Sequence, residues 1–310
     1  MKKCCLLFCI AVIPFYVCAE NQIVDLGRFN FSLSPKILKD GSITDIGLGI
    51  MYTDTLGGEL RFRNTNISKN EELLGVSDSL NAVTENSFEL FILPIKYYVY
   101  KTASFRLWSG AGLYYNFNTL AEKGFFNMPA LETMNPPRER VNSYTNNFSM
   151  HLLGPLADIG ISYTADWFNV AFSGGIIPVF FLHSSQEISI VPLLDPNHAE
   201  FSQDTWGSPH FYVSLDSILF KYVNLVLLYD FAKLHYRTLD FNDNLKWITP
   251  ERSIATQSFK IEASVLLPMG GNMRGQIGYG YTFDTTRIDA GVTISGNRQY
   301  LILTAKKINN

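Results

Sequence analysis

A strict two-residue alternation over residues 274–295 is the feature of this chain that most constrains its fold. At the odd positions of residues 275–283 the chain carries glycine, isoleucine, tyrosine, tyrosine and phenylalanine, whereas the even positions between them are small or polar. A second alternating set, residues 288–294, follows a turn predicted at residues 284–286. Because a period of two places each set on one face of a strand, the pattern predicts a hairpin with one apolar, aromatic face and one small or charged face.

The same alternation recurs along most of the chain. The clearest stretches are residues 45–52, 105–116, 210–216 and 258–267. In each stretch large apolar side chains occupy every second position, and mainly glycine, serine or charged side chains lie between them. The chain is therefore predicted to be all-β and built from half-buried antiparallel strands.

Connections of two lengths separate these strands. Short connections are predicted at residues 53–56, 101–103, 164–166, 217–222 and 268–273, and long ones at residues 34–41, 64–85, 118–147, 184–206 and 238–255. The two lengths alternate almost throughout, which is typical of an antiparallel barrel that crosses a membrane with short periplasmic turns and long external loops. A periplasmic β-sandwich is the soluble alternative, but it has no reason to segregate loop length.

The strand count is about twelve, from a first strand at residues 23–33 to a last strand at residues 287–295. Residues 300–306 form a further strand-like segment without an obvious partner, and residues 187–193 are the best place for another strand. Single-chain bacterial barrels have even strand numbers. The predicted fold is therefore an antiparallel transmembrane β-barrel of about 12 strands, with 14 as the alternative.

The start of the chain predicts export. Lys2 and Lys3 form a basic start, an uncharged stretch follows, and a signal-peptide cleavage is predicted between Ala19 and Glu20. The predicted domains are a signal peptide, residues 1–19, and a single barrel domain, residues 20–310. All four cysteines fall in the signal peptide, so we expect an exported chain without disulfides, cysteine-based metal sites or a cysteine nucleophile.

The composition agrees with a membrane barrel and excludes other classes. Aromatic residues make up 14% of the chain and charged residues only 17%, against about 25% charged residues in a typical soluble domain. Loss of the two lysines of the signal peptide changes the formal net charge from −3 to −5, so no basic field is present to attract nucleic acid. The best candidate for a helical span, residues 167–186, contains Pro178 and alternates with a period of two, which favours a strand.

These features together resemble the bacterial outer-membrane β-barrel proteins, the class that includes porins and OmpW-like and FadL-like channels. The resemblance covers nearly all of the exported chain and rests on the leader and the strand pattern, without a specific family motif. It implies a place in the outer membrane of a diderm bacterium, with outer-membrane lipid and the barrel-assembly machinery as partners. The ending, residues 306–310, departs from the class, in which many barrels end in an aromatic residue.

The polar strand faces are expected to line a water-filled lumen, because a charge that faces lipid costs about 2–4 kcal/mol at mid-bilayer. The charged residues predicted to line the lumen and set its selectivity are Arg61, Arg63, Arg106, Lys260, Glu262, Arg274, Arg287 and Asp289. The alternative interpretation is that these side chains only brace the wall through ion pairs.

The long connection at residues 118–147 is the second candidate site. Its first half is apolar and contains Phe125 and Phe126, and its second half is charged and contains Arg138 and Arg140. Loops of this length usually have a role or are disordered. One hypothesis is that the loop folds into the mouth of the barrel and narrows it, with the two arginines at the constriction. The other is a solvated or surface-packed loop.

The predicted function is passive passage of small solutes through a porin-like channel. The alternatives are a FadL-like carrier of hydrophobic molecules, with Trp108 and Tyr114 on its inward faces, and a surface adhesin or structural barrel. His210 and Ser214 share a strand face without a third partner, and the five histidines show no ligand spacing along the chain. We therefore expect no enzyme, no catalytic residue, no metal site and no cofactor.

Overall fold

The computed structural model describes residues 29–72, 80–128, 140–191, 198–207, 209–241, 247–270, 273–288 and 293–307, which are almost entirely strand. Among these residues, no helix is long and apolar enough to span a membrane. The strands are β1 (Phe29–Leu38), β2 (Gly41–Met51), β3 (Leu56–Glu72), β4 (Leu80–Lys101), β5 (Phe105–Met128), β6 (Arg140–Thr164), β7 (Phe168–Ile177), β8 (Phe180–Val191), β9 (His198–Gly207), β10 (His210–Leu219), β11 (Val223–Arg237), β12 (Asp240–Phe241), β13 (Trp247–Ile248), β14 (Glu251–Gly270), β15 (Met273–Ile288) and β16 (Thr293–Lys307).

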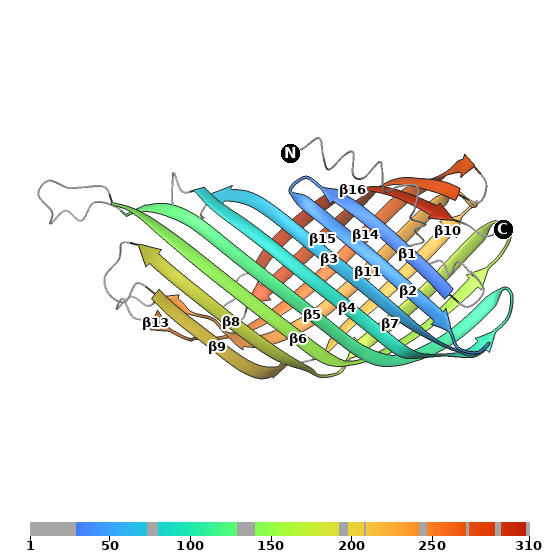
Figure 1. The fold of residues 1–310 in the computed structure, drawn as a ribbon, viewed down its shortest axis with the longest axis horizontal. Helices are drawn as coiled ribbons and strands as arrows, with labels where there is room; N and C mark the ends of the chain where they lie inside the picture. Colours follow the sequence, from blue (N-terminus) through green and yellow to red (C-terminus); the bar gives the residue numbers. More distant parts are fainter. Residues whose placement is uncertain are drawn as a thin grey trace, which may run out of the picture.

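The sheet closes into a barrel of twelve antiparallel strands (Figure 1). β6 pairs with β7 along its C-terminal part and with β8 along its N-terminal part, so β7 and β8 form one broken strand. β10 and β9 pair with β7 and β8 in the same way and form a second broken strand. The breaks lie at Pro178 and Pro209, which have no N–H to give to a ladder. The pairing of β1 with β16 closes the ring, and the predicted fold class and strand number are confirmed.

The outer surface of the barrel carries an apolar band. On β6 its exposed side chains run from Tyr163 through Ile161 and Ile159 to Leu153. These positions span about 33 Å along the strand, or about 25 Å along the barrel axis at a tilt of about 40°. This is the height of the lipid-facing band in outer-membrane barrels, so the band fits the hydrocarbon core of a membrane.

One end of the band lies beside the short turns and is rich in exposed aromatic rings. These rings belong to Tyr52, Tyr97, Tyr100, Tyr163, Trp167, Phe220 and Tyr222. Trp167 stacks on Phe220, with ring centroids 5.8 Å apart. Phe220 and Lys221 have positive φ angles of 52° and 64°, which is the turn geometry that matches the twist of a tight hairpin. Aromatic girdles of this kind mark the membrane–water interface in barrels.

The other end of the band is also sharp, and we call it the membrane edge. On nine of the twelve strands of the ring it is marked by one large apolar outward side chain, namely Phe62, Phe88, Phe117, Leu153, Phe181, Trp206, Phe231, Phe259 and Phe283. The next outward side chains are polar in every case: Asn64, Asn86, Thr119, His151, His183, Asp204, Lys233, Gln257 and Thr285. The outer face therefore changes from lipid-facing to water-facing within one strand repeat.

The wall continues beyond the membrane edge, and unevenly. β5 runs eleven residues past Phe117 to Met128, or roughly 28 Å at the usual strand rise and barrel tilt. The β5–β6 hairpin and the β8–β9 hairpin extend far past the β1–β2 turn at residues 39–40 (Figure 1). At this end of the barrel the described wall is consequently high on the β5–β9 side and low on the β1–β2 side.

Several predicted boundaries are wrong, and the cause is this extension. Most of the predicted long connections at residues 64–85, 118–147 and 184–206 are strand. Beyond the membrane edge neither face meets lipid, so the alternation disappears while the backbone pairing continues. The short connections are confirmed where the structure describes them, between β2 and β3, β4 and β5, β6 and β7, and β10 and β11.

The end of the chain also differs from the prediction. β15 runs unbroken from Met273 to Ile288, so the turn predicted at residues 284–286 is wrong. The last strand is β16, which contains the segment 300–306 that had no assigned partner and pairs with both β15 and β1. The first strand is displaced as well, because β1 covers Phe29–Leu38 where residues 23–33 were predicted.

Candidate functional site

The candidate site is the lumen, where one side of the wall carries a network of charges. Lys36 of β1 donates hydrogen bonds to Asp45 of β2 at 2.7 Å and to Glu262 of β14 at 2.8 Å. Lys260 forms an ion pair with the same Glu262 oxygen at 2.8 Å, and the Tyr300 hydroxyl donates to it at 2.6 Å. Lys36 and Glu262 are each only 1% exposed. Because water does not reach these charges, each is stabilised by its ion-pair partners.

The network continues around the wall through β3 and β4. Arg63 of β3 donates to Asp45 at 2.6 Å and to Glu89 of β4 at 3.4 Å. Arg63 therefore links the Lys36 contacts with Asp45 and Glu262 to the β4 side of the lumen. Together the contacts of this network join β1, β2, β3, β4, β14 and β16, which are not all neighbours, and they fix the inner wall at this depth.

A second charged group lies beside this network. Glu59 of β3 is held by Arg61 and by the ammonium group of Lys96, the latter at 2.6 Å. Lys96 also lies over the ring of Trp108, 4.7 Å from its centroid. A cation over an indole face is attracted by the ring quadrupole, so Trp108 connects the charged side of the lumen to its aromatic side.

The aromatic side is organised around one buried carboxylate, Asp158 of β6. It accepts a hydrogen bond from the Trp108 indole N–H at 3.1 Å and another from the Tyr212 hydroxyl at 2.6 Å. Gly160 makes room for this arrangement, because a Cβ atom there would lie 2.1 Å from the Trp108 ring. The two hydrogen bonds satisfy a carboxylate that is 1% exposed.

Between the two sides lies a cavity of about 900 Å³. Its lining includes Ala103 and Ala165 in the short turns and reaches Glu85 and Arg298 toward the opposite end. Arg298 of β16 approaches Glu85 of β4 to 3.4 Å. β1, β2 and β3 lie between these two strands in the sheet, so this ion pair spans the lumen near the membrane edge.

An apolar cluster packs inside the barrel on the side opposite the charges. The buried cluster consists of Leu93, Tyr114, Met150, Leu152, Leu156, Ile177, Phe180, Leu182, Tyr212 and Leu234. Tyr212 also lines the cavity, so the cluster forms one boundary of it. The open volume therefore lies mainly against the charged side of the wall.

Most of the predicted lumen residues lie at this cavity. Arg61, Arg63, Arg106 and Lys260 line it, and Glu262 is buried behind Lys260. Arg61, Arg63, Lys260 and Glu262 all take part in ion pairs. Arg106 has no hydrogen-bond or ion-pair partner among the described residues.

Of the other three predicted lumen residues, one lies away from the cavity, and two fall outside the part of the chain whose side chains the structure describes. Arg287 is exposed, and it lies on the same outer strand face as Phe283 and Thr285. β15 has no turn that would exchange its inner and outer faces. Arg274 lies in β15, but its side chain is outside the described residues, and Asp289 is outside them entirely. Arg287 is therefore a residue of the outer rim.

Sequence reasoning missed two cations of the network. Lys36 was assigned to a connection, whereas it lies in β1. Lys96 follows a register shift between Ile92 and Ile95, where the exposed Pro94 falls. A bulge inserts one residue and reverses the alternation, which is why Lys96 faces inward although the period-two pattern fails there. A proline within an alternating stretch is the signal that could have located the bulge.

The predicted constriction loop is not folded into the mouth where the structure describes it. Phe125 and Phe126 belong to β5 and pair with Ser143 and Asn142 of β6 in the projecting hairpin. Arg140 is the first residue of β6, and Arg138 lies outside the described residues. The backbone of these segments heightens the wall. The side chains of Phe125, Phe126 and Arg140 lie outside the described residues, so their role in a constriction stays a prediction.

Comparison with protein-family models and with curated protein sequences finds no match. Solved structures are similar over most of the chain. The outer-membrane protease OmpT of Escherichia coli is 10% identical, with 90% of this chain and 92% of that chain covered and a TM-score of 0.31. OmpT of Vibrio cholerae, an outer membrane protein, is 9% identical, with 90% and 96% covered and a TM-score of 0.23. The outer membrane transporter YddB of E. coli is 8% identical, with 88% and 50% covered and a TM-score of 0.19.

The fold is that of the bacterial outer-membrane β-barrel proteins. The closed twelve-strand ring, its apolar band and its aromatic borders carry this conclusion. The prediction that the chain is not an enzyme needs correction, because the similar structures include a protease, which is an enzyme. Membership of this fold class therefore does not exclude catalysis, and an identity of 10% transfers no activity to this chain.

Proposed function

We propose that this barrel is a porin-like channel for the passive passage of small polar solutes across the outer membrane. The observation that carries the proposal is the cavity of about 900 Å³, which is bordered by short-turn residues at one end and by Glu85 and Arg298 toward the other. Its charged wall offers a water-filled path with a low cost for polar solutes. Its partners are the solutes, the surrounding lipid and the barrel-assembly machinery.

The charges of the wall suggest how selectivity arises. Arg61, Arg63 and Lys260 lie next to carboxylates that offset their charge. Arg106 lines the same cavity without such a partner among the described residues. An unpaired cation on the wall of a lumen attracts anions and repels cations, so we assign to Arg106 a bias toward anionic solutes.

Conductance across a planar lipid bilayer tests both parts of the proposal. Folded protein should give discrete conductance steps, and a salt gradient should give a reversal potential that indicates a preference for anions. R106E should shift that potential toward cation preference. R287E is the matched control, because it makes the same charge change on the outer rim and should leave the potential unchanged.

Two outcomes would contradict the proposal in different ways. A correctly folded barrel without conductance would exclude the channel. A conducting barrel whose selectivity is the same in wild type and R106E would retain the channel and exclude Arg106 as the determinant.

Export by a signal peptide, residues 1–19, followed by a single barrel domain, residues 20–310, belongs to the same proposal. Ala19 and Glu20 lie outside the described residues. N-terminal sequencing of the protein purified from outer membranes should begin at Glu20.

A further inference from the structure

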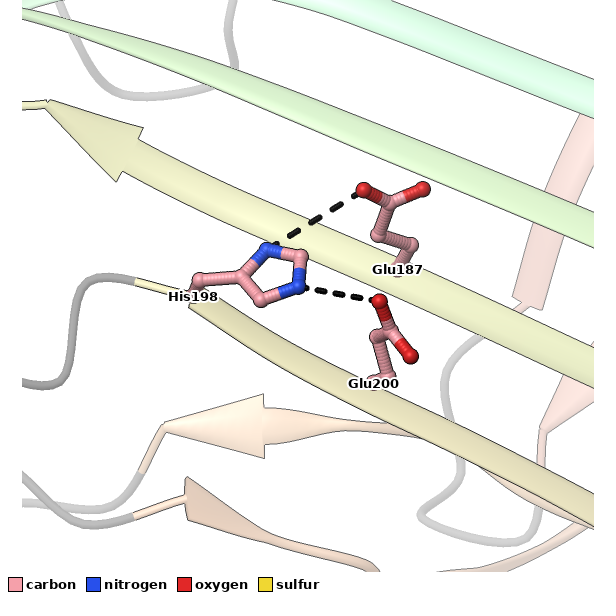
Figure 2. Close-up of side chains that lie close together, drawn as sticks. All are labelled: Glu187, His198 and Glu200. Atoms are coloured by element: carbon pink, nitrogen blue, oxygen red, sulfur yellow. Dashed lines mark hydrogen bonds and ion pairs between the residues drawn. The ribbon is translucent and has the colours of Figure 1, made fainter.

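Three side chains on the outer face of the β8–β9 hairpin meet beyond the membrane edge. Glu187 of β8 is paired directly with Glu200 of β9, and His198 lies two residues before Glu200 on the same face. The Nε2 atom of His198 is 3.1 Å from a Glu200 oxygen, and its Nδ1 atom is 4.0 Å from a Glu187 oxygen. Figure 2 shows the imidazole between the two carboxylates, one from each strand.

The pairing of the two glutamates is unfavourable without a cation. Like charges directly opposite each other on antiparallel strands destabilise the pair. Among the described residues, no lysine or arginine forms an ion pair with Glu187 or Glu200, and His198 is the only basic group in contact with them. The ladder holds both side chains on one face, directly opposite each other.

The composition of the cluster indicates which cation fits. One ligand atom from each of the three side chains lies within 4.8 Å of the others, so small side-chain rotations bring all three to one ion. An imidazole nitrogen with two carboxylate oxygens suits borderline metals such as Zn²⁺, whereas Ca²⁺ and Mg²⁺ favour oxygen ligands alone. Two carboxylates also neutralise the charge of a divalent ion.

We propose that Glu187, His198 and Glu200 form a binding site for a divalent transition-metal ion, with Zn²⁺ as its probe. Spacing along the chain gave no sign of this site, because Glu187 belongs to a different strand. The three side chains are 46–72% exposed, so the ion is reached directly from water and keeps coordination positions open to it.

The site lies outside the membrane. Glu187 is six residues past Phe181 on β8, or about 15 Å beyond the membrane edge at the usual rise and tilt. The site is on the outer face of the wall, whereas the lumen network is on the inner face. Metal binding there is consequently independent of the channel.

Calorimetric titration of the folded full chain, without a polyhistidine tag, with zinc chloride tests the proposal. The titration is run in mildly alkaline buffer, because metal ligands must be deprotonated to bind. We expect one saturable site per chain. H198Q, E187Q and E200Q should each weaken Zn²⁺ binding about tenfold or more.

Matched controls remove the same groups elsewhere. H235N and E251Q change an exposed histidine and an exposed glutamate outside the cluster, and both should bind Zn²⁺ as the wild type does. A gel comparison of unheated and boiled samples shows that each variant is folded. The proposal is overturned by the absence of saturable binding. It is also overturned if folded H198Q keeps wild-type affinity, or if a control variant loses it.

Discussion

Removal of Lys36 is the sharpest test of the lumen network. The K36M variant keeps most of the side-chain volume but leaves Glu262 and Asp45 without a shared cation. Loss of one partner of a buried ion pair costs about 3–5 kcal/mol. Glu262 retains Lys260 at 2.8 Å, and Asp45 retains Arg63 at 2.6 Å, so we expect the lower end, about 3 kcal/mol. This lowers the folding equilibrium constant by a factor of about 100.

The measurement is urea unfolding of the barrel in phospholipid vesicles, with K36M and D45N made separately and together. In the double variant Glu262 still has Lys260 and Arg63 still has Glu89. The double variant should therefore lose less than the sum of the single losses, by about 0.5–3 kcal/mol. K233M is the control on the outer surface and should change stability by less than about 0.5 kcal/mol. Wild-type stability in K36M, or strict additivity in the double variant, would refute the idea that Lys36 offsets these carboxylates.

Two further predictions concern the lipid face and the aromatic side of the lumen. I159R places a charge where a 66% exposed isoleucine faces the middle of the apolar band. It should lower the free energy of unfolding in vesicles by about 2–4 kcal/mol, against about 0–1 kcal/mol for S149R beyond the membrane edge. Equal losses in the two variants would contradict the placement of that edge. G160V inserts a side chain where even a Cβ atom would meet the Trp108 ring at 2.1 Å. It should therefore destabilise the barrel by about 1–3 kcal/mol and change the indole fluorescence. Unchanged stability together with unchanged fluorescence would show that the ring does not pack there.

The fold could be predicted inside the membrane because two solvents act on the two faces of each strand. Lipid outside and polar groups inside force the alternation seen from Ile277 to Phe283, and it ends where β15 passes the membrane edge. Beyond the edge neither face meets lipid, so the strand extensions of β5, β6, β8 and β9 left no periodic signal. The end of the alternation at Phe283 was therefore read as a turn, and this error placed Arg287 on the wrong face.

The site was only partly predictable for a related reason. The two-residue alternation predicts that Arg61, Arg63 and Lys260 face inward. It cannot show which inward side chains contact one another across a closed ring. The contact of Lys36 with Glu262 depends on the β1–β16 closure, which joins opposite ends of the chain. The Glu187–His198 contact depends on the register of β8 and β9, which sequence alone left as one loop.

The uneven height of the wall has a consequence for access from outside the cell. The mouth is cut obliquely, with its low lip at the β1–β2 turn and its high side formed by the β5–β6 and β8–β9 hairpins (Figure 1). In the proposed channel, solutes that diffuse along the cell surface would reach the lumen more readily over the low flank than over the high one. The rotational orientation of the barrel among its neighbours in the membrane plane would then influence entry.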